Sequence, residues 1–436
     1  MNILKLGVKN LLIFFLIYFY YFKFNFQDED FDISLIKIAY YCNSIKNGGV
    51  ERVISLLINY LSKEKMFLQY LITKKEISEE EYPIPNSTRR ISLAEKRTSL
   101  FEIIDKKHID ILIYNLYDKR EIIKLNKLKK TKIIYYDHSC FLFWIYEKVY
   151  NFKDTIYYYY KNCKYVISLI PLENDYLFKK WGINSILMDN PSTYEYDSVI
   201  PSDLINKNII MIGRSDDPLK RFDLGIKAMK TIIKEIPKSK MNILSFADDK
   251  NKKLIFDLNL TNYVKFEGYK KNIEKYLRNT SLHIMPSISE TYPMVLSETK
   301  IFGIPSILCG LDYLVLSNDG TIIIYDDESE TIAKEAIKIL KNDEYRKKLG
   351  KEARKSMEKH KNELIAKRWV KLILSIYNQD EKSFTELKIS DNLYKINEKQ
   401  ANLIFLNQLK LLQRRNPLFQ KVTLDNLKNY YFKNIS

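Results

Sequence analysis

The segment SLHIMPSISETYPMVLSETKIFGIP, residues 281–305, has the pattern of a β-strand that leads through a short loop into an α-helix. Its first residues are mostly apolar, which is typical of a buried strand. Pro293 suits the first turn of a helix, where its missing N–H would be unpaired in any case. Gly303 fits the end of a helix that covers residues 294–302. The segment therefore predicts a strand, a loop that carries Glu290, and a helix.

The alternation of strand and helix patterns continues on both sides of this segment. Apolar runs predict strands at residues 35–42, 67–73, 109–115, 131–137 and 164–170 in the first half, and at residues 209–214, 241–247, 263–269, 281–287 and 304–310 in the second half. Helical stretches lie between several of them, which is typical of parallel sheets covered on both faces. Residues 189–208 are less periodic, contain two prolines and predict a linker.

We therefore expect an α/β protein with two doubly wound, Rossmann-like domains that face a cleft. The predicted domains cover residues 32–192 and 205–375. Ligands of such folds bind at the carboxyl ends of the parallel strands, so we expect the site between the two domains.

The two ends of the chain have patterns of their own. Residues 1–30 hold an uncharged apolar core at positions 11–22, shorter than the ~20 residues that a bilayer span requires. We expect a hydrophobic segment that anchors the chain to a membrane in a single pass, and the alternative is a segment packed on the folded body. Residues 376–436 predict a basic helical extension, which would lie on a membrane or a partner, or would instead cap the second domain.

Composition narrows the class of protein. The 436 residues are 46% apolar, enough for sizeable cores, and carry a net charge of +17 from 71 basic and 54 acidic side chains. This charge favours anionic partners. It is spread along the chain without a recognisable basic and aromatic module, so we expect no nucleic-acid partner. The four cysteines are far apart and predict neither a zinc site nor a disulfide framework.

The opening segment also carries candidate site residues. The free N–H groups at the start of its helix, from Met294 onward, would form an anion site. Glu298, a turn into the helix, would face the same cleft, where its carboxylate can accept two hydrogen bonds from a vicinal diol such as a ribose. The alternative is that Glu290 and Glu298 are solvated acids that flank a helix.

A second candidate lies in IIMIGRSDDPLKRFDL, residues 209–224. Arg214 leaves a strand end, and Lys220 follows at the start of a helix. Two cations at one strand–helix junction can neutralise a diphosphate. The alternative for each is a solvated surface charge.

Several stretches together resemble family 4 glycosyltransferases, which have the two-domain GT-B fold. NGGVER (residues 47–52) is similar to the first glycine loop of that family, and GRSDDPLKRFDLGIKA (213–228) to its donor-phosphate segment. SETYPMVLSE (289–298) resembles its element of two glutamates eight positions apart. The segment at 166–191 resembles the end of its first domain. The resemblance covers roughly residues 37–371 and departs from the family at Thr291 and Pro191, where the family often has small residues.

The resemblance implies a role for each matching residue. The catalytic set would be His138, Arg214, Lys220 and Glu290, with the two cations holding the diphosphate and the other two residues near the donor sugar. The donor-binding set would be Gly48, Gly49, Gly268, Tyr292, Pro293, Met294, Val295 and Glu298. Within it, the paired glycines would let the backbone approach the donor, Glu298 would bind the ribose, and Gly268 would form the turn beside the base. The alternative for His138 is a satisfied core histidine.

The implied activity is transfer of a sugar, with retention of anomeric configuration, from a nucleotide-sugar donor to an acceptor. Residues 32–192 would form the acceptor domain and residues 205–375 the nucleotide-sugar domain of this hexosyltransferase. No cofactor and no metal would be needed. The hydrophobic N-terminus and the basic tail favour a glycan or lipid-linked acceptor at a membrane. A GT-B sugar epimerase or phosphorylase is a second enzyme hypothesis, which matches the glycine loop less well. A catalytically silent GT-B scaffold protein is the alternative from a different class.

Overall fold

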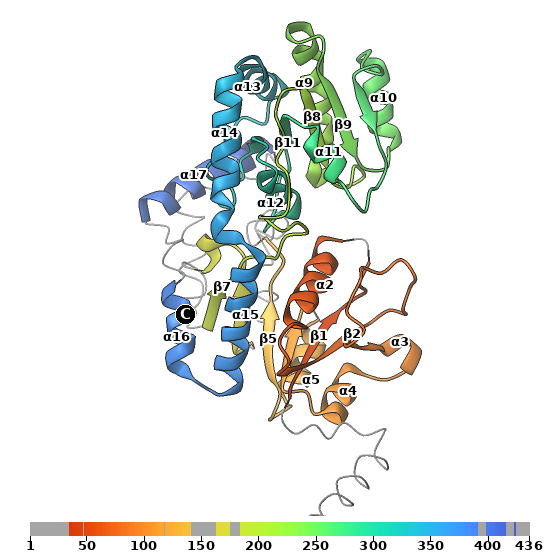
Figure 1. The fold of residues 1–436 in the computed structure, drawn as a ribbon, viewed down its shortest axis with the longest axis vertical. Helices are drawn as coiled ribbons and strands as arrows, with labels where there is room; N and C mark the ends of the chain where they lie inside the picture. Colours follow the sequence, from red (N-terminus) through yellow and green to blue (C-terminus); the bar gives the residue numbers. More distant parts are fainter. Residues whose placement is uncertain are drawn as a thin grey trace, which may run out of the picture.

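A computed structural model describes residues 35–46, 48–116, 118–140, 163–174, 184–390, 398–415 and 423 of the 436-residue chain. Two lobes, each built around one sheet, are stacked along the long axis of the molecule (Figure 1). The two sheets are purely parallel in the described pairings, as the alternating sequence pattern predicted.

The first lobe contains a seven-stranded sheet in the order β3-β2-β1-β4-β5-β6-β7. Its strands are β1 (Ile36–Cys42), β2 (Phe67–Thr73), β3 (Arg89–Ser92), β4 (Ile111–Tyr114), β5 (Lys132–Tyr136), β6 (Tyr165–Ser168) and β7 (Asn184–Leu187). Its helices are α2 (Gly49–Leu61), α3 (Leu93–Lys96), α4 (Leu100–Lys107) and α5 (Lys119–Leu125).

The second lobe contains a six-stranded sheet in the order β10-β9-β8-β11-β12-β13. Its strands are β8 (Asn208–Ile212), β9 (Lys240–Leu244), β10 (Val264–Phe266), β11 (Leu282–Met285), β12 (Ser306–Cys309) and β13 (Thr321–Ile324). The helical elements that follow these strands are η3 (Pro218–Lys220), α9 (Phe222–Glu235), α10 (Asp249–Asp257), α11 (Glu274–Arg278), α12 (Met294–Ile301), α13 (Ser329–Lys341), α14 (Asp343–Ser356) and η4 (Glu358–His360).

Burial on both faces explains why the strands are nearly continuous apolar runs. Every residue of β4, β6, β11 and β12 is buried, and six of the seven residues of β1 are buried. Helices on both sides of a parallel sheet leave no solvent-facing strand surface, so polar residues have no side to occupy. All ten predicted strands are present, and the sequence analysis did not identify β3, β7 and β13.

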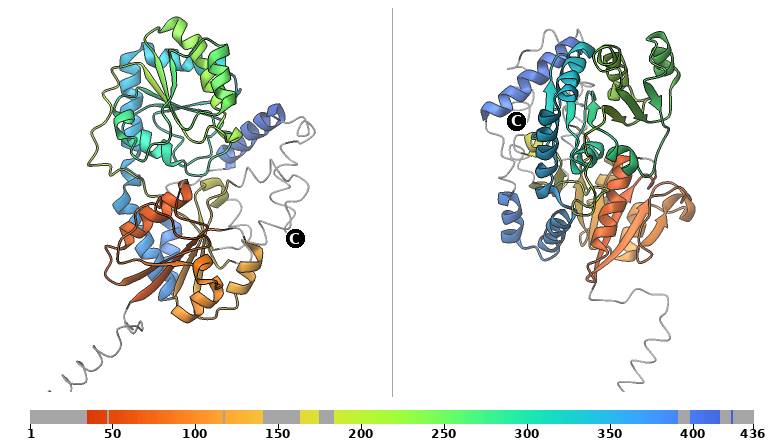
Figure 2. Two further views of the ribbon diagram at one scale, coloured as in Figure 1. Left: turned by 90° about the vertical axis from the view of Figure 1, so that its right-hand side faces the viewer. Right: turned by 45° about the horizontal axis from the view of Figure 1, so that its top comes forward.

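The chain crosses back to the first lobe near its end. Helix α15 (Asn362–Tyr377) packs beside α2, where Asn362 Nδ2 donates to Tyr60 Oη at 2.6 Å. Arg368 Nη2 donates to Leu187 O in β7 at 2.9 Å. Helix α16 (Glu381–Ser390) follows α15 down the same side of the first lobe (Figures 1 and 2). The sequence pattern assigned most of α15 to the second domain, whereas the structure places it against the first sheet.

Helix α17 (Glu398–Arg415) belongs to the C-terminal extension, for which one alternative was a cap on the second domain. It packs on the second lobe, with Phe405, Leu409 and Leu411 buried and Leu403 exposed. Its residues therefore cap the second lobe over this range.

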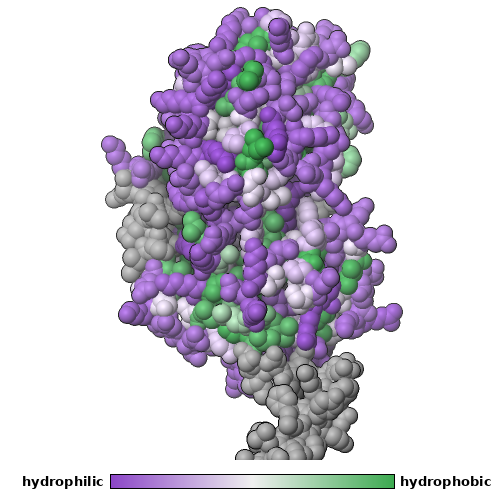
Figure 3. Space-filling model, in the orientation of Figure 1, coloured by the Kyte–Doolittle hydropathy of each residue, from purple (hydrophilic) through white to green (hydrophobic). Residues whose placement is uncertain are grey.

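The predicted N-terminal hydrophobic segment, residues 1–30, lies outside the described residues. Among the helices that are described, none combines the length and the apolar character needed to cross a bilayer. The face shown in Figure 3 is mostly hydrophilic, with smaller apolar areas.

Candidate active site

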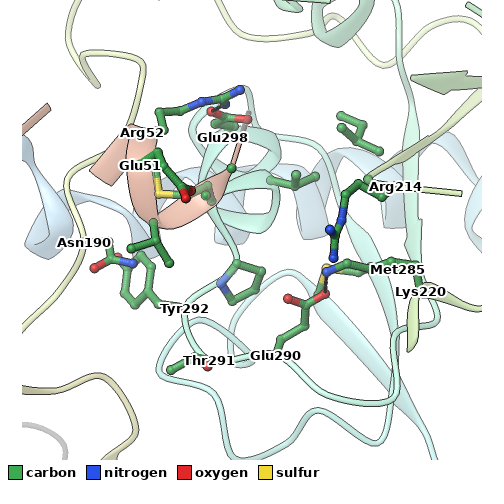
Figure 4. Close-up of a pocket in the computed structure, with 18 of the residues that line it drawn as sticks. Glu51, Arg52, Asn190, Arg214, Lys220, Met285, Glu290, Thr291, Tyr292 and Glu298 are labelled. Carbon is green, nitrogen blue, oxygen red and sulfur yellow. Dashed lines mark hydrogen bonds and ion pairs between the residues drawn. The ribbon is translucent and has the colours of Figure 1, made fainter. Parts of the chain in front are cut away.

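A cavity of about 540 Å³ lies between the two lobes, at the carboxyl ends of their strands (Figure 4). It is lined by most of the residues predicted for the site. They are Gly48, Gly49, His138, Arg214, Lys220, Glu290, Tyr292, Pro293, Met294, Val295 and Glu298. Gly268 is the exception, although Tyr269 and Lys270, directly after it, line the cavity.

The cationic wall of the cavity belongs to the second lobe. Lys220, at the end of η3, places its Nζ 2.6 Å from Glu290 Oε1, and both side chains are mostly buried. Arg214 follows β8 and pairs with Asp217 at 2.8 Å, but its side chain remains 73% exposed. An exposed pair of this kind contributes little. The Arg214 guanidinium is therefore available to a second anion at small cost.

The start of α12 faces the same cavity. Pro293 is the N-cap residue, and the first helical hydrogen bonds run from Leu296 N and Ser297 N to Pro293 O. The amides of Met294 and Val295 precede these bonds, and both residues line the cavity. Amides that have no place in the helical ladder, at the positive end of the helix dipole, favour an anion.

Glu298 is not a solvated acid. Its side chain is 1% exposed, and its Oε1 lies 3.0 Å from Arg52 Nη1 of the first lobe. Its second oxygen, Oε2, is buried without a hydrogen-bond partner among the described residues. A buried carboxylate oxygen that lacks a donor is costly. Glu298 can therefore still accept a hydrogen bond from a ligand hydroxyl. Glu290 is not a solvated acid either, because its side chain is mostly buried and pairs with Lys220.

The glycine loop enters the cavity from the first lobe. A Cβ on Gly48 would lie 1.9 Å from Glu51 Oε2, because the Glu51 side chain folds back over that residue. A Cβ on Gly49 would meet no atom within 4 Å and would point into open space. A side chain at position 48 would therefore have to displace the Glu51 carboxylate, whereas one at position 49 would extend into open space at the start of α2.

His138 follows β5 and lines the cavity. Its Nε2 lies 3.0 Å from Asn115 Oδ1, which accepts the hydrogen bond, since the amide nitrogen of Asn115 donates to Tyr41 O and Ile113 O. Burial lowers the pKa of His138 well below its usual range, so the ring is neutral at pH 7. The histidine is both hydrogen-bonded and part of the cavity wall.

The loop of Glu290 also reaches across the cleft. Thr291 Oγ1 donates to His138 O at 3.0 Å, which joins the second lobe to the first. Gly268, after β10, has φ +76, a left-handed conformation that favours glycine. This turn sets the direction of Tyr269 at the edge of the cavity.

Sequence reasoning missed several cavity residues. Glu51 and Arg52 belong to the NGGVER motif and sit in the first turn of α2, so their place in the motif was the available signal. Burial raises the pKa of Glu51, opposed by its own backbone hydrogen bond and by Arg214. Asn190 lies within the segment at 166–191, and Tyr269 directly follows Gly268, so both were close to a recognised signal, whereas Tyr82 carried none. The described residues contain no cluster of histidine, cysteine, aspartate or glutamate arranged to hold a metal.

Comparison with known proteins supplies the class of enzyme. Residues 196–356 match the family described as "Glycosyl transferases group 1". This part of the chain is a glycosyltransferase domain. The glycosyltransferase domain contains Arg214, Lys220, Glu290 and Glu298, so the prediction of a transferase is confirmed at the level of this domain.

Two relatives are similar to longer stretches. An uncharacterized glycosyltransferase of Haemophilus influenzae is 23% identical over 214 residues, which are 48% of this chain and 60% of that protein. An α-1,4-N-acetyl-D-galactosaminyltransferase of Campylobacter jejuni that acts on an undecaprenol-linked acceptor is 21% identical over 366 residues, 79% of this chain and 100% of that enzyme. The match to the first relative thus spans less than two thirds of its length.

Solved structures of similar fold cover more than three quarters of this chain. Sucrose-phosphate synthase from Thermosynechococcus elongatus superposes with a TM-score of 0.65 at 16% identity, over 79% of this chain and 100% of that one. An Anabaena protein in complex with UDP and glucose superposes with a TM-score of 0.62 at 15% identity, over 78% of this chain and 100% of that one. The two-lobed GT-B fold around the glycosyltransferase domain is therefore confirmed.

Proposed function

We propose that this chain is a retaining, family 4 glycosyltransferase that transfers a sugar from a nucleoside diphosphate donor to a glycan or lipid-linked acceptor. The observation that carries the proposal is the convergence of Arg214, Lys220 and the start of α12 on one wall of the interlobe cavity. Two cations and a helix start match the charge of a diphosphate. Cations held in a fixed arrangement also stabilise the charge that develops on a leaving diphosphate.

The donor sugar and nucleoside have candidate partners on either side of these cations. Glu290, beside Lys220, and the neutral His138 would contact the sugar, and the backbone of Gly48 and Gly49 would approach the donor. Glu298, whose Oε2 lacks a donor, would accept a ribose hydroxyl. The Gly268 turn, with Tyr269, would lie beside the base. In this arrangement the acceptor oxygen bonds to the anomeric carbon as the bond from that carbon to the diphosphate oxygen breaks, and the proton of the acceptor hydroxyl passes to the departing diphosphate.

The names of similar proteins support a specific class of donor and of product. The Anabaena structure holds UDP and glucose, which favours a uridine diphosphate sugar as donor. The Campylobacter relative is named for an α-linked product and an undecaprenol-linked acceptor. These names support retention and a lipid-linked acceptor for this chain as well.

The test is binding and turnover of a panel of nucleotide sugars by the full chain. Glu298→Ala and Arg214→Ala are compared with wild type and with Lys410→Ala, a control at an exposed position of α17. We expect one donor to be bound and slowly hydrolysed by wild type and the control, and by neither cavity variant. The anomeric configuration of the product, read by NMR, tests retention. If no donor binds to wild type, the catalytically silent scaffold is the better description.

We further propose that residues 1–30 anchor the protein to a membrane, because a lipid-linked acceptor is confined there. The test is fractionation of membranes that contain the full chain, with Leu16→Asp as the comparison. An anchor predicts that wild type stays with the membrane after alkaline washing and that the variant is released. Equal release of both proteins would contradict the anchor.

A further inference from the structure

The backbone of Glu290, in the loop between β11 and α12, is hydrogen-bonded by Tyr313, which lies in the later loop between β12 and β13. Tyr313 Oη lies 3.1 Å from Glu290 N and 3.1 Å from Glu290 O. One hydroxyl therefore accepts from the amide and donates to the carbonyl of the same residue. The Tyr313 side chain is 1% exposed, and Cys140 Sγ lies 3.5 Å from the same hydroxyl. Tyr313 thus fixes the point from which the Glu290 carboxylate reaches Lys220.

The neighbour of Tyr313 is tied to α17. Asp312 Oδ1 accepts from Gln408 Nε2 at 3.2 Å, and Asp312 Oδ2 accepts from Asn407 Nδ2 at 3.2 Å and from Tyr325 Oη at 3.3 Å. Gln408 also donates to Gly310 O and is fully buried. Burial raises the pKa of Asp312, and these hydrogen bonds oppose the shift. The side-chain amides of Asn407, which is half-buried, and Gln408, which is buried, thus attach α17 to the loop of residues 310–320 between β12 and β13.

The fit of α17 against this loop is close. Gly310 has φ +63, and a Cβ there would lie 2.1 Å from Leu411 Cδ1. Leu411 is fully buried. The other end of the loop is held as well, because Lys300 Nζ of α12 donates to Leu316 O at 2.8 Å and to Asn318 O at 2.9 Å. A loop held at both ends has little freedom to shift Tyr313.

We propose that α17 positions Glu290 for the transfer reaction, acting through Asp312 and Tyr313. The role assigned to Glu290 rests on the proposed function, whereas the structural link from α17 through Asp312 and Tyr313 to the Glu290 backbone does not. Gln408 and Tyr313 are positioning residues, since neither lines the cavity. The helix that follows the two lobes is thereby part of the support of the active site.

The experiment compares four full-length proteins with wild type: Gln408→Ala, Tyr313→Phe, the double variant, and Lys410→Ala as the control on an exposed face of α17. Two readouts are used. The first is kcat and KM for donor turnover. The second is hydrogen–deuterium exchange of the peptide that contains Glu290, measured in the free protein at a temperature where all variants are folded.

We expect Gln408→Ala and Tyr313→Phe each to lower kcat about tenfold and to leave donor KM within about twofold, because misplacing a catalytic group affects the transition state more than binding. The double variant should fall no further than Tyr313→Phe alone, because both act along one route. Both single variants should speed exchange of the Glu290 peptide, and Lys410→Ala should match wild type. Partial unfolding would also lower the apparent kcat at an unchanged KM, but it would speed exchange in many parts of the chain, whereas misplacement of Glu290 should speed exchange mainly in its own peptide.

Three results would overturn the inference. One is a double variant whose losses multiply, which would mean that α17 acts by another route. Another is unchanged exchange of the Glu290 peptide in Gln408→Ala, whatever the kinetics. The third is an unchanged kcat in an active enzyme. If wild type processes no nucleotide sugar, the proposed function fails, and the exchange readout still decides whether α17 holds Glu290.

Discussion

Arg52 Nη1 lies 3.0 Å from Glu298 Oε1, although 246 residues separate the two in the sequence. Arg52 is in the first turn of α2 in the first lobe, and Glu298 is in α12 of the second. This ion pair spans the cleft beside the cavity. A ribose that binds Glu298 must therefore share the carboxylate with Arg52 or displace it, so donor binding and the contact between the lobes are linked.

The first prediction concerns this pair. Arg52→Ala should destabilise the protein by about 2 kcal/mol, less than the loss typical of a fully buried pair, because the cavity can admit water to Glu298. Urea unfolding measures the change. In the Glu298→Gln background the charge to be compensated is absent, so Arg52→Ala should cost clearly less there. Equal costs in both backgrounds would show that the pair is not coupled.

The second prediction concerns the cationic wall. Lys220→Met should lower kcat for donor turnover by about 10²- to 10³-fold, as expected when a fixed group that stabilises transition-state charge is lost. Asp217→Asn is the matched control: it removes the charge that pairs with Arg214 and keeps the Oδ1 that accepts from Leu219 N. This control should retain or improve donor affinity. A large loss in the control would show that Asp217 itself serves the reaction.

The third prediction separates stability from activity at the glycine loop. Gly49→Val adds a side chain where a Cβ would meet no protein atom, so the midpoint of thermal unfolding should change little. The same side chain would enter the cavity and should abolish donor turnover. A variant that unfolds at the wild-type temperature and keeps full activity would remove Gly49 from the site.

The fourth prediction concerns pH. Burial lowers the pKa of His283 in β11 to about 3, so the folded protein leaves this ring neutral where the unfolded chain protonates it. The unfolded state then binds more protons below about pH 6.5, and the free energy of unfolding must fall as the pH falls from there towards 3. For this one group the loss between pH 7.5 and pH 5 is about 2 kcal/mol.

Urea unfolding at pH 7.5 and pH 5 checks this expectation with His283→Gln. The variant should lose about 2 kcal/mol less than wild type over that interval, since it has no imidazole to protonate on unfolding. His138, whose pKa burial also lowers, should add to the fall seen in both proteins. An identical fall in wild type and variant would exclude His283 as a source.

Most strands could be predicted from the sequence because each is a short, nearly continuous apolar run. Residues such as Ile38, Ile113 and Ile284 are buried on strands that are covered on both faces, so the whole run is apolar and visible without an alignment. Strand β13, with three isoleucines in four residues, meets this criterion as well and was overlooked, although residues 321–323 are only half-buried. The packing of α15 against the first lobe was not predicted, because the sequence of an amphipathic helix shows that one face is buried but not which sheet that face packs against.

The site was predictable in part for the same reason. Glu290, Pro293 and Glu298 lie within one strand–loop–helix unit, whose local geometry follows from its own residues. Gly48 and Arg214 open two other units of the same kind. The carboxyl ends of parallel strands lie along one edge of a sheet, so residues that follow such strands converge whichever strands they follow.

The sequence by itself determined the secondary structure, the parallel sheets and the chemical types of side chain at the strand ends, because each depends on residues close together in the chain. Only the tertiary structure decided that Arg52 meets Glu298, that Thr291 reaches His138, and that Gln408 of α17 reaches the loop that holds Glu290. These contacts join residues more than 90 positions apart. They depend on how the two lobes and a terminal helix pack together, which no local pattern of residues specifies.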